Sequence, residues 1–243
     1  NITGDTKNSK RRPYEVYMPP ISLNESLSMD LVRKLTSKDH SFNVSGIATS
    51  ADGARDLPLE WGEIIPLMLL PENRRHAFEF MLWSYPLRRY TESPKMFPEL
   101  LQIGAFIRNW MEAIPLNIAV LISGDMSHTH QASGPYGYSN ASAPFDAAVG
   151  SWATHPCSLD GPDLLLHTAR SLKPHALSCG FTGMVLLHGM LCSKSVSTLW
   201  PQLDNDRVWV NQNASYYGMM AATFGPSEQQ HKKKPTAESI YRF

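Results

Sequence analysis

The chain has 243 residues, and its 22 basic and 22 acidic side chains give a formal net charge of zero at pH 7. This balance excludes the electrostatic footprint of a protein that binds nucleic acid or an anionic membrane surface. Hydrophobic residues make up an ordinary 42% of the chain. No apolar run approaches the roughly 20 residues of a membrane-spanning helix, so we expect a soluble protein without a membrane span.

The cysteine content indicates the compartment. The chain has an odd number of cysteines, without CxxC spacing, at positions Cys157, Cys179 and Cys192. This pattern predicts neither a disulfide framework nor a zinc ribbon. A reducing compartment is the simpler interpretation. Glycosylation sequons could instead indicate secretion; they lie at Asn1, Asn24, Asn43, Asn140 and Asn213. Because sequons are common by chance and Asn140 lies beside the expected site loop, we expect an intracellular protein, either cytoplasmic or mitochondrial.

The N-terminal part predicts an arm, a helix and a short strand. Residues 1–13 are polar and basic, which is typical of a mobile arm. A helix ending at Leu35 follows, capped by Ser22 or Asn24, because apolar residues recur every four positions before it. Asn43–Thr49 is a candidate strand.

The next part predicts two helices and a core strand. Leu57–Leu70 begins as a loop and becomes an apolar helix, in which Pro66 is tolerable only in the first turn. Alternating apolar residues in His76–Tyr85 predict a second core strand. Phe97–Ile114 is the clearest helix, with apolar residues every three and four positions, and we expect it to serve packing alone.

The segment Asn117–Tyr138 organises the rest of the chain. It starts as an unbroken apolar run, which predicts a strand buried on both faces, and turns polar at Ser123 before a tight glycine- and proline-rich loop. In an open α/β sheet, ligands bind beyond the carboxyl ends of the strands. Four residues lie where chemistry would then be done: Asp125, Ser127, His128 and His130.

Two helices, a buried segment and a strand pair are expected after this loop. They cover Ala143–Trp152, Leu159–Leu172, Leu177–Leu191, Val208–Ala214 and Tyr216–Phe224. Residues 225–243 form a polar tail, which predicts either disorder or an arm that folds on a partner.

Three short segments resemble a known family. They are Ser123-Gly124-Asp125-Met126-Ser127-His128, then Gly134-Pro135-Tyr136-Gly137-Tyr138, and then Phe145-Asp146. Together they resemble the signature of the class III extradiol dioxygenases, non-haem iron enzymes that open catechol-type rings and share a superfamily with the Memo proteins. The order of elements is similar from about Tyr14 to Phe224. The resemblance implies a single α/β domain over residues 14–224, with a mixed central β-sheet flanked by helices. The family's first strand, which ends in a metal-binding histidine, would lie upstream of Asn1.

The resemblance also implies a set of site residues. Such an enzyme holds Fe(II) with two histidines and a carboxylate and uses a further histidine as acid/base, a position that His128 matches. In this chain Trp61 occupies the position of the second metal histidine, and Ser178 that of the carboxylate. An indole has no lone pair for iron, and a neutral hydroxyl is a poor substitute for a carboxylate.

These two replacements predict a degenerate site without an iron cofactor. Trp61 would fill the former metal cavity. The other expected pocket residues are His130, Tyr136, Tyr138 and Ser178. We expect the protein to act as a structural or interaction subunit among the protein subunits of a homo- or hetero-oligomeric assembly. Asp125, Ser127 and His128 are the candidate catalytic residues, and His128 could be a relic or a working acid/base.

The alternative is an active Fe(II) extradiol dioxygenase that uses an upstream histidine and a displaced carboxylate. A displaced metal could recruit Glu60, Asp125, His128, His130 and Cys179. A hydrogen bond to a neighbour is the simpler expectation for His130. For Cys179, which could have a lowered pKa at a helix start, we expect a buried small residue.

Overall fold

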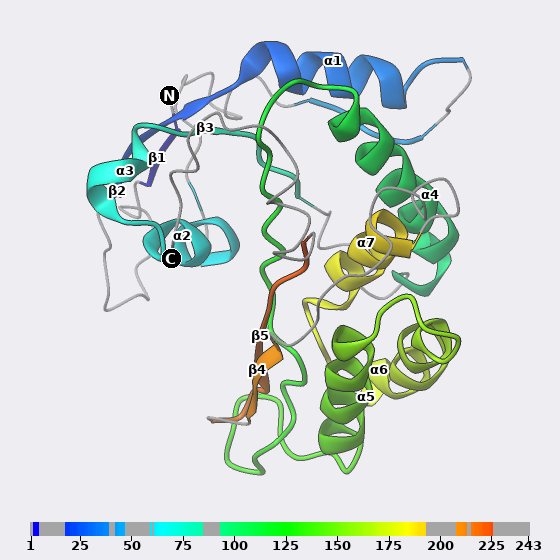
Figure 1. The fold of residues 1–243 in the computed structure, drawn as a ribbon. Coiled ribbons are helices and arrows are strands. Elements are labelled where there is room, and N and C mark those ends of the chain that lie inside the picture. Colours follow the sequence, from blue (N-terminus) through cyan, green and yellow to red (C-terminus); the bar gives the residue numbers. More distant parts are fainter. Residues whose placement is uncertain are drawn as a thin grey trace. The chain divides into compact units, whose positions relative to one another are not determined.

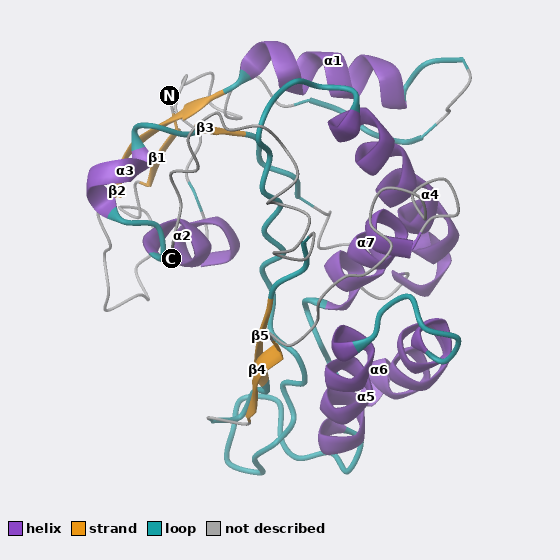
Figure 2. Cartoon of the chain, in the orientation of Figure 1, coloured by secondary structure: helices purple, strands orange, loops and turns teal. Residues whose placement is uncertain are grey.

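The computed structural model has helices and small sheets in two compact units, namely Asn1–Gly124 with Thr182–Leu187, and Asp125–Phe181 with His188–Phe243 (Figures 1 and 2). The single α/β domain that the sequence predicted over residues 14–224 includes parts of both units. The structure describes residues 2–4, 18–38, 42–46, 59, 61–84, 93–192, 208–212 and 215–225. Glu60 and the polar tail beyond residue 225 lie outside them.

The first unit contains a three-stranded sheet in the order β1-β2-β3. Strand β1 (Ile2–Gly4) runs antiparallel to β2 (Met18–Leu23), and β3 (Glu79–Phe80) is parallel to β2. Strand β1 lies in the expected N-terminal arm. Strand β3 is much shorter than the predicted strand His76–Tyr85, because only two of its residues pair with β2.

Three helices of the first unit match predicted segments. In α1 (Glu25–Leu35) the Asn24 side chain accepts a hydrogen bond from the Leu27 backbone N–H at 2.8 Å, which confirms the predicted cap. Helix α4 (Ser93–Glu112) confirms the clearest predicted helix. Helix α2 (Trp61–Met68) contains Pro66, whose position was predicted wrongly. It is the sixth residue of the helix, beyond the first turn, and without an N–H it cannot donate the helical hydrogen bond to the carbonyl of Gly62.

Buried side chains explain why these elements fold. Ile21 from β2 and two residues of α2, Ile64 and Leu67, form an apolar core with Leu59. The four-residue helix α3 (Glu72–Arg75) follows α2.

The second unit is mostly helical. It contains α5 (Ser142–Thr154), the π-helix η2 (Asp163–Ala169), α6 (Arg170–Ala176) and part of α7 (Phe181–Cys192). Strands β4 (Val208–Gln212) and β5 (Met219–Ala222) lie where the sequence predicted a strand pair and are antiparallel, seen side by side in Figure 1. None of the helices in the described ranges is long and apolar enough to cross a bilayer.

The apolar run at Asn117–Ile122 is not the buried strand that its composition predicted. It pairs with no described strand and is drawn as loop in Figure 2. Within this run, Val120 and Leu121 are 42% and 56% exposed. Apolar β-branched composition favours an extended strand, but burial also needs neighbouring strands, and the described strands form two small separate sheets. Phe42–Gly46 is also outside any strand.

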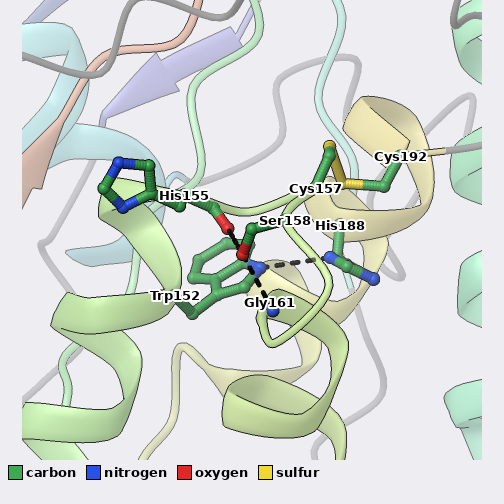
Figure 3. Close-up of a disulfide and its surroundings, with 7 residues drawn as sticks. All are labelled: Trp152, His155, Cys157, Ser158, Gly161, His188 and Cys192. Carbon is green, nitrogen blue, oxygen red and sulfur yellow. Dashed lines mark hydrogen bonds between the residues drawn. A yellow bond between two sulfur atoms is a disulfide. The ribbon is translucent and has the colours of Figure 1, made fainter.

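A disulfide joins Cys157, in the loop after α5, to Cys192 at the end of α7 (Figure 3). The expectation of no disulfide was therefore wrong, because the odd cysteine count concealed a pair brought together by the fold. Beside it, the Trp152 indole N–H donates to Nδ1 of His188 at 3.1 Å. Burial lowers the pKa of His188 to about 4, so this ring is neutral and can accept that bond. The cysteine content no longer favours a reducing compartment.

Removing this disulfide should lower stability measurably. The two cysteines are 35 residues apart, and a loop of that length restricts the unfolded chain by about 4 kcal/mol in the chain-entropy treatment. We expect Cys157→Ser/Cys192→Ser to lower the free energy of unfolding in urea by about that amount. Cys179→Ser, outside the disulfide, is the matched control and should cost less than about 1 kcal/mol. Equal stability of the double variant and the native chain would contradict the pairing.

Candidate functional site

The segment Asp125–His130 is fixed along one side by the junction between α6 and α7. The backbone N–H of His128 donates to the carbonyl of Ala176 at 2.8 Å. The backbone N–H of Gly180 donates to the carbonyl of Asp125 at 3.0 Å. Two bonds from different points of the junction fix both the position and the direction of the segment.

The other side of the segment is held by the residues before β5. The Met126 N–H donates to the Gly218 carbonyl at 3.2 Å, and the His130 N–H donates to the Tyr216 carbonyl at 3.0 Å. Tyr216 also packs so closely on the loop that a Cβ at Gly134 would lie 2.6 Å from its Cβ. This close approach explains why residue 134 is a glycine. From the sequence alone, that glycine could be interpreted only as a turn signal.

Three side chains with ionisable groups meet on this segment. His128 Nε2 lies 3.1 Å from Asp125 Oδ2, and the Cys179 sulfur accepts the Asp125 backbone N–H at 3.1 Å. The His128 side chain is 12% exposed and the Asp125 side chain 47%. Tyr136 stacks on the His128 ring, with centroids 5.2 Å apart and planes 20° from parallel. The cluster therefore has a nearly buried imidazole and a carboxylate open to solvent.

The neighbours of His128 keep it protonated. Burial alone would lower its pKa, but the hydrogen bonds that Asp125 and Cys179 accept from the ring, together with the charges of these groups, outweigh burial and raise the pKa to about 9. Near neutral pH the ring is therefore an imidazolium. It can donate a proton or a hydrogen bond, but it is poorly suited to accept a proton.

His130 belongs to a separate, buried pair. Its Nε2 lies 2.7 Å from Asp146 Oδ2, with both side chains less than a tenth exposed. Asp146 Oδ1 accepts the Ser127 backbone N–H at 2.9 Å. Burial raises the pKa of Asp146, and these hydrogen bonds oppose that rise. A Cβ at Gly218 would collide with the Asp146 carboxylate, so the pair depends on glycine there.

Ser127 lies in a buried network of hydroxyl groups. Its Oγ donates to the Ala176 carbonyl at 3.3 Å and lies 3.5 Å from Thr129 Oγ1. Thr129 Oγ1 in turn lies 2.6 Å from Ser142 Oγ on α5. Full burial and these bonds give the Ser127 hydroxyl a role in holding the segment to α5 and α6.

The remaining predicted pocket residues are Ser178, Tyr138 and Trp61. Ser178 is 1% exposed, and its Oγ donates to the Asp125 carbonyl at 2.9 Å. Tyr138 is 68% exposed, although its backbone bridges to His130. Trp61 is the first residue of α2 in the first unit, and its side chain lies outside the described residues. The prediction that its indole fills a former metal cavity stays a prediction.

The described residues do not fit the iron site that the resemblance implies. At the carboxylate position, the Ser178 hydroxyl is neutral and already donates to a backbone carbonyl. Fe(II) in a two-histidine, one-carboxylate site needs an anionic oxygen. No step through iron is derived for this chain.

No protein-family model matches the chain, and no curated protein matches it. The geometry of the site must therefore carry the functional interpretation.

Sequence reasoning missed part of the site. Cys179 is exposed, not the buried small residue expected, and it belongs to the His128 cluster. Its position just before an expected helix was the sequence feature that could have indicated a functional cysteine. Asp146 was part of the quoted motif Phe145-Asp146, but nothing local indicated its pairing with His130. Tyr216, whose ring centroid is 6.3 Å from that of His128, carried no signal because it is distant in sequence.

The raised pKa of His128 predicts a pH-dependent stability. The folded-state value of about 9 exceeds the ordinary 6.5, so the protonated ring stabilises the fold fully below pH 6.5, and this contribution is lost as the pH rises through 9. Asp125→Asn should therefore be most destabilising near the low end of that window, and its cost should shrink toward the high end. Asp163→Asn, beside the exposed His167, is the matched control. NMR titration of the His128 ring near 6.5 in the native chain would contradict this assignment.

Proposed function

We propose that this chain is an extradiol-dioxygenase-like protein that has lost its catalytic iron and acts as a structural or interaction subunit. Under this proposal the two units belong to the mixed α/β fold of that family. The observation that carries the proposal is the buried Ser178 hydroxyl, which donates to the Asp125 carbonyl.

Ser178 supports the proposal because its bond is structural. An oxygen that coordinates Fe(II) must be anionic or have its lone pairs aimed at the metal. Here the hydroxyl proton is committed to a carbonyl that also accepts the Gly180 N–H. A buried hydrogen bond of this kind contributes about 1 kcal/mol to stability. The residue at the position of a ligand therefore joins two segments of the site.

The protonation of His128 also leaves this residue poorly suited to act as a general base. A general base should have a pKa near the working pH, and a pKa of about 9 leaves little free imidazole at neutrality. Asp125 stabilises the charged ring, and Tyr136 covers one of its faces. These contacts suit a relic of the family's acid/base that is retained for its hydrogen bonds.

An exposed apolar segment supports the interaction role. Val120 and Leu121 are each more than 40% exposed, within a run of strand-forming residues that pairs with no described strand. Unpaired backbone groups beside apolar side chains are a template for pairing with another chain. A second copy of this chain offers the same run and could pair with it in a symmetric manner.

The absence of catalytic iron can be measured directly. Protein prepared without oxygen, incubated with Fe(II) and desalted should retain far less than one iron per chain, and should consume neither catechol nor dioxygen. Cys179→Ser should be assayed in parallel, because any iron lost in that variant was bound outside the family's ligand positions. Stoichiometric iron with catechol-dependent oxygen uptake would overturn the proposal.

The interaction role predicts self-association through the apolar run. In sedimentation velocity at increasing concentration, we expect the native chain to sediment faster than a 27.2 kDa monomer. Leu121→Asp should shift it toward the monomer, because a charge in an apolar contact is costly to desolvate. Leu159→Asp is the matched control, since Leu159 is 98% exposed but lies outside the run. A monomer at every concentration, or equal loss in both variants, would contradict the use of this surface.

A further inference from the structure

The cluster around His128 has the composition and spacing of a metal site that differs from the family's iron centre. Asp125, His128 and Cys179 each offer one ligand atom, and these atoms lie within 4.8 Å of one another. In the part of the chain that the structure describes, no other group of three such side chains meets this criterion. In the iron enzymes the position of His128 is an acid/base, so this ligand set is a different one.

The distances suit a tetrahedral cation of the zinc class. Bonds of about 2.0–2.3 Å at tetrahedral angles separate neighbouring ligand atoms by roughly 3.4–3.6 Å. His128 Nε2 and Asp125 Oδ2 are 3.1 Å apart, close to that value. A cation between them would replace the proton that these two atoms now share. The Cys179 sulfur would complete a set of nitrogen, oxygen and sulfur ligands, which borderline-soft Zn²⁺ accepts.

The backbone holds these ligands in place. The Gly180 N–H bonds to the Asp125 carbonyl and the Asp125 N–H bonds to the Cys179 sulfur, so the two ligand-bearing segments are tied together. An N–H donor to a thiolate is the kind of outer contact that orients a metal ligand. His130 is held away by Asp146, which leaves three protein ligands.

Exposure and charge also fit a cation. Cys179 is exposed and the Asp125 side chain is half exposed, which gives an ion a path from solvent and leaves a fourth position for water. A carboxylate and a thiolate together carry two negative charges, which match a divalent cation. We propose that Asp125, His128 and Cys179 bind a divalent cation of the zinc class with water as the fourth ligand.

Binding must be coupled to protons. The metal requires a neutral imidazole and a thiolate, so it displaces the His128 proton and any proton on Cys179. The affinity should therefore rise with pH across the range in which these groups are protonated. This coupling concerns only the ligand cluster and does not depend on the absence of iron at the family's positions.

Cd²⁺ and Co²⁺ provide spectroscopic tests on the whole chain after removal of metals by a chelator. Cd²⁺ should give a thiolate-to-metal charge-transfer band that saturates at one equivalent. Co²⁺ should give the intense visible bands of four-coordination. Cys157 and Cys192 form the disulfide, so a thiolate band reports Cys179. The double variant Cys157→Ser/Cys192→Ser should keep the thiolate band, whereas Cys179→Ser should abolish it.

Ligand variants set the expected size of the effect. Because loss of an outer partner alone typically weakens metal binding about 10–100-fold, His128→Gln and Asp125→Asn should weaken Zn²⁺ binding at least that much in chelator competition. His167→Gln is the matched control, because that histidine also lies beside a carboxylate but without a thiol.

Circular dichroism identifies any variant that fails to fold. Cys179→Ser is the decisive variant for the metal assignment, because it changes an exposed side chain by one atom and should not disturb folding. Absence of a band at one equivalent, or its persistence in Cys179→Ser, would overturn the assignment. Either result would leave the iron measurement and the proposed structural role unaffected.

Discussion

The site depends on a backbone segment that is hydrogen-bonded from two sides. Asp125–His130 is tied to the α6–α7 junction on one side and to the residues before β5 on the other. Each bond satisfies a backbone group that would otherwise be costly to bury. The segment is not part of a regular sheet, yet it has the fixed direction that a strand in a sheet would have. Side chains on it therefore point to defined partners.

Different residues of this segment serve different purposes. Ser127 and Thr129 are buried in a hydroxyl network toward α5 and α6, while Asp125 and His128 meet Cys179 near the surface. The buried network anchors the segment, and the surface cluster has the ionisable groups. Ser178 belongs with the anchors, because its hydroxyl bonds to the Asp125 carbonyl.

Local patterns predicted much of the helical structure. Helices α1 and α4 were predicted because apolar spacing along the helix, or a cap at its start, is a local signal. The run at Asn117–Ile122 could not be placed, because its composition describes a strand and says nothing of whether neighbours are present. The Cys157–Cys192 disulfide and the Asp146–His130 pair join residues distant in sequence. Motif reasoning located Asp125 and His128, whereas Cys179 needed the fold to bring its thiol to them.

Native-state hydrogen exchange of the backbone amides tests the two-sided support most directly. The amides of His128, Gly180 and Met126 should exchange slowly, with opening free energies near that of the most protected amides of α5, because each is hydrogen-bonded within the frame. The exposed Val120, which lies outside it, should exchange close to the rate of an open peptide. If the amides of His128 and Gly180 exchange as fast as that of Val120, the segment is not held, and the cluster of Asp125, His128 and Cys179 has no fixed geometry.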